Sequence, residues 1–276
     1  MGCDDARIHR IDKGAAVTDT TSLSTIEFQV SDHVATVTLN RPEKLNSFTE
    51  QMAAELATVW ARVRDDDDIH VAVLQANGER AFCTGIDVAQ GTWWKHKSVF
   101  NQEDPGELLG PKAHKVWKPV IAALHGIVAG GAMYFVNECD FSICAETTTF
   151  FDPHANAGIV SALEPMGMLP LGVPYGEVMR WALLGSEERM TAQTALRIGI
   201  VTEVVPDDQL RARAAELAAE IAARRPAGIQ GTVRAMWEAR DLPPTIAARH
   251  GKFYTDLGNA GATPDSLNNK KKPRTR

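Results

Sequence analysis

Alternating and periodic hydrophobic positions in the first half of the chain predict an α/β chain. Residues 26–30 and 34–39 alternate apolar and polar side chains on either side of a short polar turn, as in a β-hairpin. Thr49 is expected to cap a helix whose apolar positions are Met52, Leu56, Val59, Trp60 and Val63. Buried strands are expected at residues 70–75, 119–124 and 139–144, with a glycine-rich turn and a helix between the last two. Strands and helices that recur in this order favour an α/β fold.

The second half of the chain is mostly helical. Helical periodicity predicts helices at about 176–184, 191–198, 207–224, 228–239 and 243–257, with a short strand at 200–205. We therefore divide the chain into a loose N-terminal extension (1–23), a core (24–206) and a C-terminal helical region (207–276).

Composition narrows the possible functions. The hydrophobic content of 44% is enough for a large buried core, and the net charge of −6 argues against nucleic acid as a partner. The four cysteines have no zinc-ligand spacing, so we expect reduced thiols and no metal site. The sequence shows no signal peptide and no apolar run that would span a bilayer. These features predict a cytoplasmic protein without a membrane partner.

Four segments carry residues suited to chemistry. They are residues 41–47 (RPEKLNS), 81–87 (AFCTGID), 118–132 (KPVIAALHGIVAGGA) and 150–160 (FFDPHANAGIV). Gly130 and Gly131 at a helix start leave backbone N–H groups available to an anion, and Gly85-Ile86 offers another such donor. Two donors that converge on one oxygen form an oxyanion hole. Alternatively, these glycines only allow tight packing of a helix on a strand.

The order and spacing of the four segments resemble those of the crotonase (enoyl-CoA hydratase/isomerase) superfamily, from about residue 26 to the tail. The resemblance implies a crotonase-like spiral of ββα turns over the core, followed by a C-terminal helical region used in trimer assembly. The partners implied are an acyl-CoA substrate and further copies of the chain, as a homotrimer or a dimer of trimers. Coenzyme A would enter as part of the thioester, with no cofactor bound permanently. The thioester carbonyl would lie between the backbone N–H groups of Ile86 and Gly131, which stabilise an enolate.

The same resemblance assigns residues to the binding of coenzyme A. Lys44 lies where the first loop of the family meets the nucleotide, and Lys271 belongs to a basic run near the phosphates. The remaining positions assigned to this binding site are Leu45, Thr84, Gly85, Asp87 and Gly130. A solvated charge run is an alternative for the tail, and a turn-forming role is an alternative for Asp87.

The catalytic positions depart from the family pattern. Hydratases of this family use two glutamates, but here Tyr134 and His154 occupy those places, which argues against hydration by a glutamate pair. His154 can act as acid or base because an imidazole titrates at about pH 6.5. We expect Asp152 to orient its ring, while Tyr134 and Glu164 offer a phenol and a carboxyl group. Each of these residues also has a purely structural alternative.

Two other functions remain open. A histidine after the proline of the fourth segment is similar to the superfamily's β-diketone hydrolases, which cleave carbon–carbon bonds without coenzyme A. A catalytically inactive family member is the third possibility. The sequence thus predicts an acyl-CoA enzyme of the hydratase/isomerase type, a lyase or isomerase, with a hydrolase using His154 as the alternative.

Overall fold

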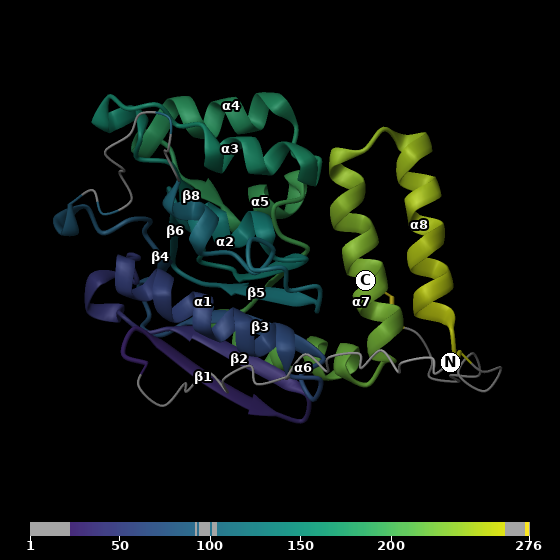
Figure 1. Ribbon diagram of the computed structural model, residues 1–276. Helices are drawn as coiled ribbons and strands as arrows, with labels where there is room; N and C mark the ends of the chain where they lie inside the picture. The colour runs from purple at the N-terminus through teal and green to yellow at the C-terminus, as the bar shows by residue number, and fades with distance from the viewer. Residues whose placement is uncertain (1–22, 92, 94–99, 101–103, 263–273, 276) are drawn as a thin grey trace, which may run out of the picture.

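The fold is known from a computed structural model, which describes residues 23–91, 93, 100, 104–262 and 274–275. Two predictions lie outside the described residues. One is the N-terminal extension, apart from its last residue, and the other is Lys271 as a residue that binds coenzyme A. Two sheets and the helices around them form the body of the molecule (Figure 1).

The larger sheet has six strands in the order β1-β2-β3-β5-β7-β10, and all neighbours except β1 and β2 are parallel. The strands are β1 (Ile26–Ser31), β2 (Val34–Leu39), β3 (Val71–Ala76), β5 (Val120–Leu124), β7 (Phe141–Ala145) and β10 (Glu203–Val205). The predicted hairpin at the start of the sheet is confirmed, as are the buried strands that follow.

The smaller sheet has four short strands in the order β4-β6-β8-β9. They are β4 (Ala81–Cys83), β6 (Ile127–Ala129), β8 (Thr149–Phe151) and β9 (Met190–Thr191). Its strands were not predicted, because strands of two or three residues are too short to show an alternating pattern.

Eight α-helices are found in the described part of the chain. They are α1 (Glu50–Asp65), α2 (Ala132–Glu138), α3 (Leu163–Met168), α4 (Tyr175–Leu184), α5 (Ala192–Ile198), α6 (Leu210–Ala222), α7 (Pro226–Glu238) and α8 (Pro244–Asn259). The predicted start of α1 is confirmed, since the Thr49 hydroxyl accepts a hydrogen bond from the Met52 backbone N at 3.1 Å. The short helix α3 was not predicted.

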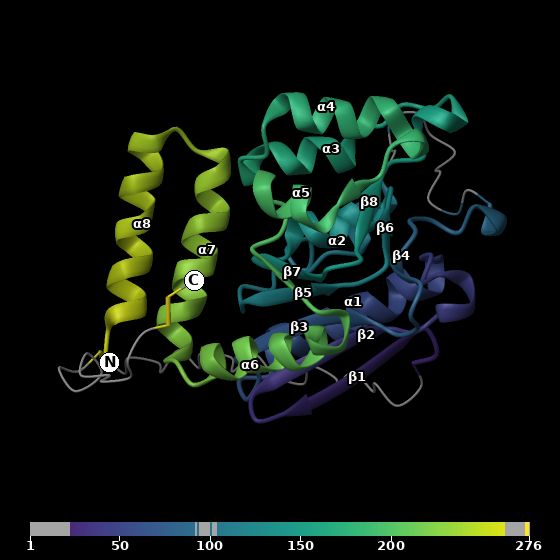
Figure 2. The same cartoon turned by 180° about the vertical axis from the view of Figure 1, so that it is seen from behind.

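The core lies on both faces of the larger sheet. Val71 and Val73 of β3 pack in a hydrophobic cluster with α6, whereas the intervening Ala72 and Leu74 pack in a cluster with α1 and the smaller sheet. Figure 2 shows α6 lying beside β3 of the larger sheet. The near-continuous apolar run of β3 thus reflects a strand that is buried on both faces.

Two predicted strands begin later than expected. The predicted strand at 139–144 starts at Phe141, because Cys139 ends α2 and the Asp140 carboxylate accepts hydrogen bonds from Lys112 Nζ at 2.9 Å and Val120 N at 2.7 Å. The predicted strand at 200–205 starts at Glu203, because Ile200 N still bonds to Ala195 O at the end of α5. Capping of the preceding helix therefore decides both boundaries.

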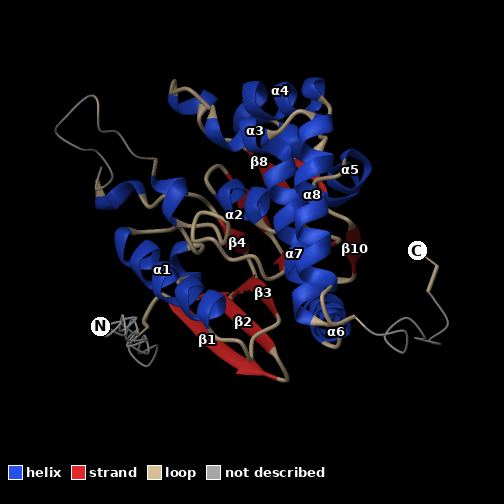
Figure 3. Cartoon of the chain, turned by 45° about the vertical axis from the view of Figure 1, so that its right-hand side comes forward, coloured by secondary structure: helices blue, strands red, loops and turns tan. Residues whose placement is uncertain are grey.

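Helices α7 and α8 form an antiparallel hairpin that stands beside the body (Figures 1 and 2). No residue of α7 is buried, and Gly258 is the sole buried residue of α8 within the described chain. Figure 3 shows both helices running along one side of the molecule, past the ends of the strands. The apolar stripes that predicted these helices are thus largely uncovered.

Candidate active site

Asp152 is the first residue after β8, and its carboxylate accepts hydrogen bonds from other residues of the candidate site. Its side chain is 0% exposed, and one oxygen accepts hydrogen bonds from the backbone N of His154 at 3.1 Å and from the ring Nδ1 of the same residue. The other oxygen accepts from the hydroxyl of Ser161. Burial alone would raise the pKa of Asp152, but the hydrogen bonds from His154 and Ser161 outweigh it and lower the pKa. Asp152 is therefore held as a carboxylate.

His154 lies between two carboxyl groups. Its Nδ1 is bonded to Asp152, and its Nε2 lies 3.7 Å from Oε1 of Glu164. The hydrogen bond that His154 donates to Asp152 is the main cause that raises the pKa of His154, and the charge of Glu164 adds to it. Because Asp152 occupies Nδ1, the nitrogen that faces Glu164 is the one free to exchange protons.

Glu164 lies in the first turn of α3 and is nearly enclosed. Its side chain is 6% exposed, and burial raises the pKa of its carboxyl group. Asn137 of α2 donates from Nδ2 to the backbone oxygen of Glu164 at 2.9 Å, which ties α2 to α3. A carboxyl group with a raised pKa beside an imidazole is suited to proton transfer near neutral pH.

Tyr134 brings a phenol to the same place from α2. Its hydroxyl interacts with the carboxylates of Glu164 and Asp104, and burial together with these charges raises the pKa of Tyr134. The group therefore stays protonated and acts as a hydrogen-bond donor. The structure thus brings together Asp152, His154, Glu164 and Tyr134, as the sequence predicted.

Three glycines fit closely against the side chains of α2. A Cβ atom on Gly106 would lie 2.3 Å from Cε1 of Tyr134, and one on Gly167 would lie 2.2 Å from Nδ2 of Asn137. A Cβ atom on Gly110 would lie 2.1 Å from Oε2 of Glu138, an oxygen that also accepts hydrogen bonds from two backbone N–H groups. Larger residues at these three positions would displace the α2 side chains, including the phenol of the site.

The turns at Gly85 and Gly131 touch. Gly85 has a φ of +86°, and a Cβ atom on it would lie 3.1 Å from the backbone N of Gly131. Phe48 bridges to the first turn on both sides of Ile86, through Phe48 N to Gly85 O at 2.8 Å and Asp87 N to Phe48 O at 2.9 Å. Among the described residues, none accepts a hydrogen bond from the backbone N–H of Ile86 or Gly131.

The second turn also contacts the cluster formed by Asp152, His154, Glu164 and Tyr134, the candidate catalytic cluster. Gly130 has a φ of +52°, and a Cβ atom on it would lie 3.2 Å from Cδ of Pro153 and 3.8 Å from Cε1 of His154. The backbone N of Gly130 donates to the oxygen of Phe151 at 3.1 Å, which joins this turn to the end of β8. The two unpaired N–H groups and the imidazole therefore belong to one site.

The residues predicted to bind coenzyme A have different surroundings. Thr84 donates its hydroxyl hydrogen to the oxygen of Leu45 at 3.4 Å, and Lys44 is exposed at the end of a 3₁₀ turn. Asp87 forms an ion pair with Arg41 at 3.0 Å and caps the next turn through Ala89 N. Asp87 thus has the turn-forming role that the sequence left as an alternative.

Sequence reasoning missed two residues that contact the candidate catalytic cluster. Ser161 follows the fourth segment closely, so its proximity to Asp152 was open to inference. Asp104 belongs to none of the four segments, and only the folded chain places it near Tyr134. No group of three or more His, Cys, Asp and Glu residues within the described chain has an arrangement that would hold a metal ion.

Cys83, Cys139 and Cys144 are buried free thiols, and burial raises the pKa of Cys83 to about 12. A thiol this hard to ionise is not a nucleophile at neutral pH. Among the described helices, none has the length and apolar character needed to cross a bilayer.

Comparison with known proteins decides the family. A family model for enoyl-CoA hydratase/isomerase matches residues 29–267, which is most of the chain. The chain belongs to the enoyl-CoA hydratase/isomerase family. The predicted resemblance to the crotonase superfamily is confirmed, and the protein is an acyl-CoA-processing enzyme of that family.

The relatives of this family member include proteins named as a hydratase and as a dehydratase. It is 35% identical over 232 residues to the (E)-benzylidenesuccinyl-CoA hydratase of Thauera aromatica, covering 84% of this chain and 88% of the relative. It is 31% identical over 221 residues to the carnitinyl-CoA dehydratase of Escherichia coli K12, covering 78% of this chain and 80% of the relative.

A solved structure confirms the crotonase fold. An enoyl-CoA hydratase/isomerase from Mycobacterium paratuberculosis superposes with a TM-score of 0.78 at 33% identity, covering 89% of this chain and 93% of that one. The expected α/β fold with a C-terminal helical region is therefore confirmed.

Proposed function

We propose that this enzyme adds water reversibly across the α,β double bond of an acyl-CoA thioester. The observation that carries the proposal is the position of His154 between Asp152 and Glu164, beside two unpaired backbone N–H groups. The names of the relatives from Thauera aromatica and Escherichia coli support hydration or dehydration. His154 and Glu164 would then replace the glutamate pair of other family members.

The backbone N–H groups of Ile86 and Gly131 would hold the thioester oxygen. Both lack a protein acceptor within the described chain, and their turns are in contact. Donors fixed before the reaction stabilise an enolate oxygen better than the neutral carbonyl, and each is worth about 2.7–4 kcal/mol in comparable enzymes. This differential binding would lower the barrier at the α and β carbons.

The proton transfers follow from the pairing of His154 with Glu164. The Glu164 carboxylate takes a proton from water while the water oxygen bonds to Cβ. The electron pair of the double bond moves into the thioester and forms the enolate. The enolate then collapses as Nε2 of the protonated His154 delivers a proton to Cα. Glu164 returns its proton to His154 across the 3.7 Å between them, and dehydration is the reverse.

Asp152 and Tyr134 would support this exchange. Asp152 keeps Nδ1 protonated and raises the pKa of His154, so the ring carries a proton to deliver. Tyr134 keeps its proton and would donate a hydrogen bond to the Glu164 carboxyl group during the reaction.

Binding of coenzyme A, location in the cell and association between copies are part of the same proposal. Lys44 and Lys271 would meet the nucleotide and phosphates of coenzyme A, with Leu45, Thr84, Gly85 and Gly130 around the thioester. The protein would act in the cytoplasm as a homotrimer or a dimer of trimers. The uncovered apolar residues of α7 and α8 support association between copies.

The test is an absorbance assay of hydration with crotonyl-CoA and (E)-benzylidenesuccinyl-CoA, with a linear β-diketone as a third substrate. We expect loss of the enoyl-CoA absorbance with at least one thioester, and a fall in kcat of about 10²–10⁴-fold in His154→Ala. The matched control is His114→Ala, a partly exposed histidine whose ring contacts the backbone oxygen of Leu108.

Unchanged turnover in His154→Ala would show that the imidazole takes no part in the reaction. Cleavage of the diketone without hydration of either thioester would replace the proposal with a carbon–carbon bond hydrolase. No turnover of any substrate would favour an inactive family member.

A further inference from the structure

A cavity borders the candidate catalytic cluster through Tyr134. Its volume is about 230 Å³, and its walls come from α2, α3, the segment 104–107 and the end of the α7–α8 hairpin. Tyr134 and Asn137 of α2 line the cavity together with Trp237 of α7 and Arg240, which follows α7. The hairpin therefore contributes side chains to a space that adjoins the catalytic residues.

Arg240 lines this cavity without an ion-pair or hydrogen-bond partner in the described chain. It is half-buried, and its guanidinium carbon lies 4.1 Å from the centre of the Trp237 ring. Burial lowers the pKa of Arg240. Within the described chain, Arg240 forms no ion pair and no hydrogen bond, so the five N–H donors of its guanidinium are unused.

Asn137 supplies a second unmatched group. It is 6% exposed, and its Oδ1 is buried without a hydrogen-bond partner in the described structure, although its Nδ2 bonds to the backbone of Glu164. Buried polar atoms in native proteins nearly always have partners, so an acceptor left open beside a cavity indicates a site for a donor. Asn137 thus offers an acceptor where Arg240 offers donors.

The carboxylates around the cavity already have partners or face solvent. Oε2 of Glu138 accepts hydrogen bonds from Lys112 N at 2.7 Å and Ala113 N at 2.8 Å, and Oδ1 of Asp104 accepts from Gly106 N at 2.8 Å. Glu107 is exposed. The charges of Glu138 and Asp241 act on Arg240, but no carboxylate of the described chain forms an ion pair or hydrogen bond with it, so the N–H donors of the guanidinium remain available to an external anion.

We infer that this cavity receives the distal end of the acyl group and that Arg240 binds a carboxylate carried there. A guanidinium binds a carboxylate through two parallel hydrogen bonds, which is the geometry that its unused donors allow. Asn137 Oδ1 would accept a hydrogen bond from a hydroxyl group or a water at the same end. The inference rests on the proposed function, because Tyr134 is a wall shared by the cavity and the catalytic cluster.

The substrate class is therefore an enoyl-CoA whose acyl group ends in a second carboxylate. The test compares (E)-2-hexenedioyl-CoA, which has a terminal carboxylate, with (E)-2-hexenoyl-CoA, which ends in a methyl group. Cinnamoyl-CoA serves as a neutral substrate with a ring. We expect the wild-type enzyme to have a kcat/KM at least about tenfold higher for the dicarboxylate.

Arg240→Met keeps the length of the side chain and removes its charge. We expect it to lower kcat/KM for hexenedioyl-CoA by about 10–100-fold and to change that for hexenoyl-CoA by less than about threefold. Arg249→Met, an exposed arginine on α8, is the matched control and should leave both values unchanged. Thermal unfolding of each variant checks that the fold is intact.

The outcomes separate the inference from the proposed function. Equal kcat/KM of the wild type for hexenedioyl-CoA and hexenoyl-CoA would overturn the inference while hydration stands. An equal loss of kcat/KM for the two substrates in Arg240→Met would do the same. A preference for cinnamoyl-CoA would also overturn it, in favour of a cavity for an aromatic ring. Absence of hydration with all three thioesters would overturn the proposed function itself.

Discussion

Helices α6 and α7 are equal in length, at 13 residues each, yet they differ completely in burial. In α6, four small or aliphatic residues, Leu210 and Ala214 among them, are buried against the larger sheet. In α7 no residue is buried. Both helices have an apolar stripe, so the difference lies in whether this chain supplies the surface that covers it.

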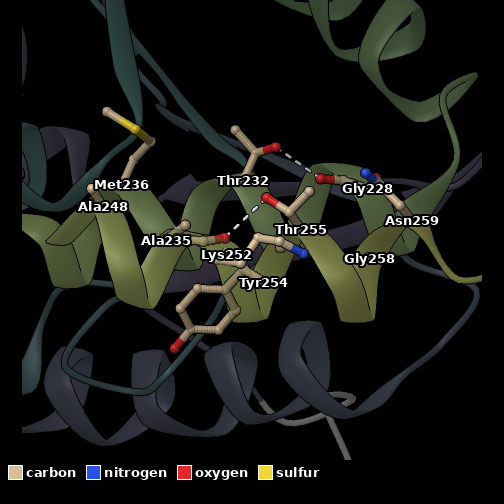
Figure 4. Close-up of a pocket in the computed structure, with 12 residues that line it drawn as sticks. Gly228, Thr232, Ala235, Met236, Ala248, Lys252, Tyr254, Thr255, Gly258 and Asn259 are labelled. Atoms are coloured by element: carbon tan, nitrogen blue, oxygen red, sulfur yellow. Dashed lines mark hydrogen bonds between the residues drawn. The ribbon is translucent and has the colours of Figure 1, made fainter. Parts of the chain in front are cut away.

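The hairpin is held by close backbone approach. Glycines line the groove of about 460 Å³ between α7 and α8, and Figure 4 shows small side chains on both of its walls. A Cβ atom on Gly258 would lie 3.1 Å from the backbone oxygen of Ala227. Meanwhile Met236, Phe253 and Leu257 are 67%, 68% and 74% exposed. The body is thus stabilised by large buried side chains, whereas large apolar side chains of the hairpin remain exposed.

Replacing a tryptophan in each region gives the largest expected contrast. Trp60 of α1 is 0% exposed and donates its indole N–H to Leu109 O at 2.9 Å, so Trp60→Ala should lower the free energy of unfolding by about 3–5 kcal/mol. Trp237→Ala in the hairpin, where the ring is half-buried, should cost less than about half as much. Denaturant titration measures both values, and equal losses would show that the hairpin is as firmly embedded as α1.

Removing exposed apolar side chains from the hairpin should change association more than stability. In Phe253→Ser/Leu257→Ser we expect the oligomer to dissociate, while the unfolding free energy of the monomer changes by less than about 1 kcal/mol. Light scattering after size exclusion measures the mass. Val30→Ser, on the exposed side of β1, is the control and should associate like the wild type. A double variant with unchanged mass would place the contact between copies elsewhere.

The smallest expected effect is a shift in a pH profile. Asp152 is the main cause of the raised pKa of His154, so Asp152→Asn should lower that pKa. The proposed mechanism needs a protonated His154, and activity is lost as pH rises through its pKa. The alkaline limb of kcat/KM should therefore move to lower pH in the variant. Ser161→Ala, which leaves the carboxylate in place, should move the limb less, and an unmoved limb in Asp152→Asn would exclude the assigned role.

The contrast also explains which parts of the fold were predictable. The hairpin of β1 and β2, the start of α1 and the C-terminal helices follow from local periodicity, which both regions share. The strands of the smaller sheet are too short for such a signal, and the burial of α6 against the exposure of α7 depends on contacts made far along the chain.

The candidate site shows the same division. The resemblance of the four segments to a known family singled out Asp152 and His154 in the fourth segment, Tyr134 just after the third and Glu164 just after the fourth, because the order of motifs reports the fold. Nothing in the sequence around Arg240 linked it to Tyr134, because residues more than a hundred positions apart meet only through tertiary packing.

The close fit of Tyr134 against Gly106 constrains how this catalyst can be re-engineered. Changing Tyr134 alone to glutamate would remove the aromatic ring that packs against Gly106. The resulting void would leave the new carboxylate without a fixed position. Conversely, a larger residue at position 106 clashes as long as the ring is present. The two positions are epistatic, and a library that aims to install a glutamate pair should vary them together.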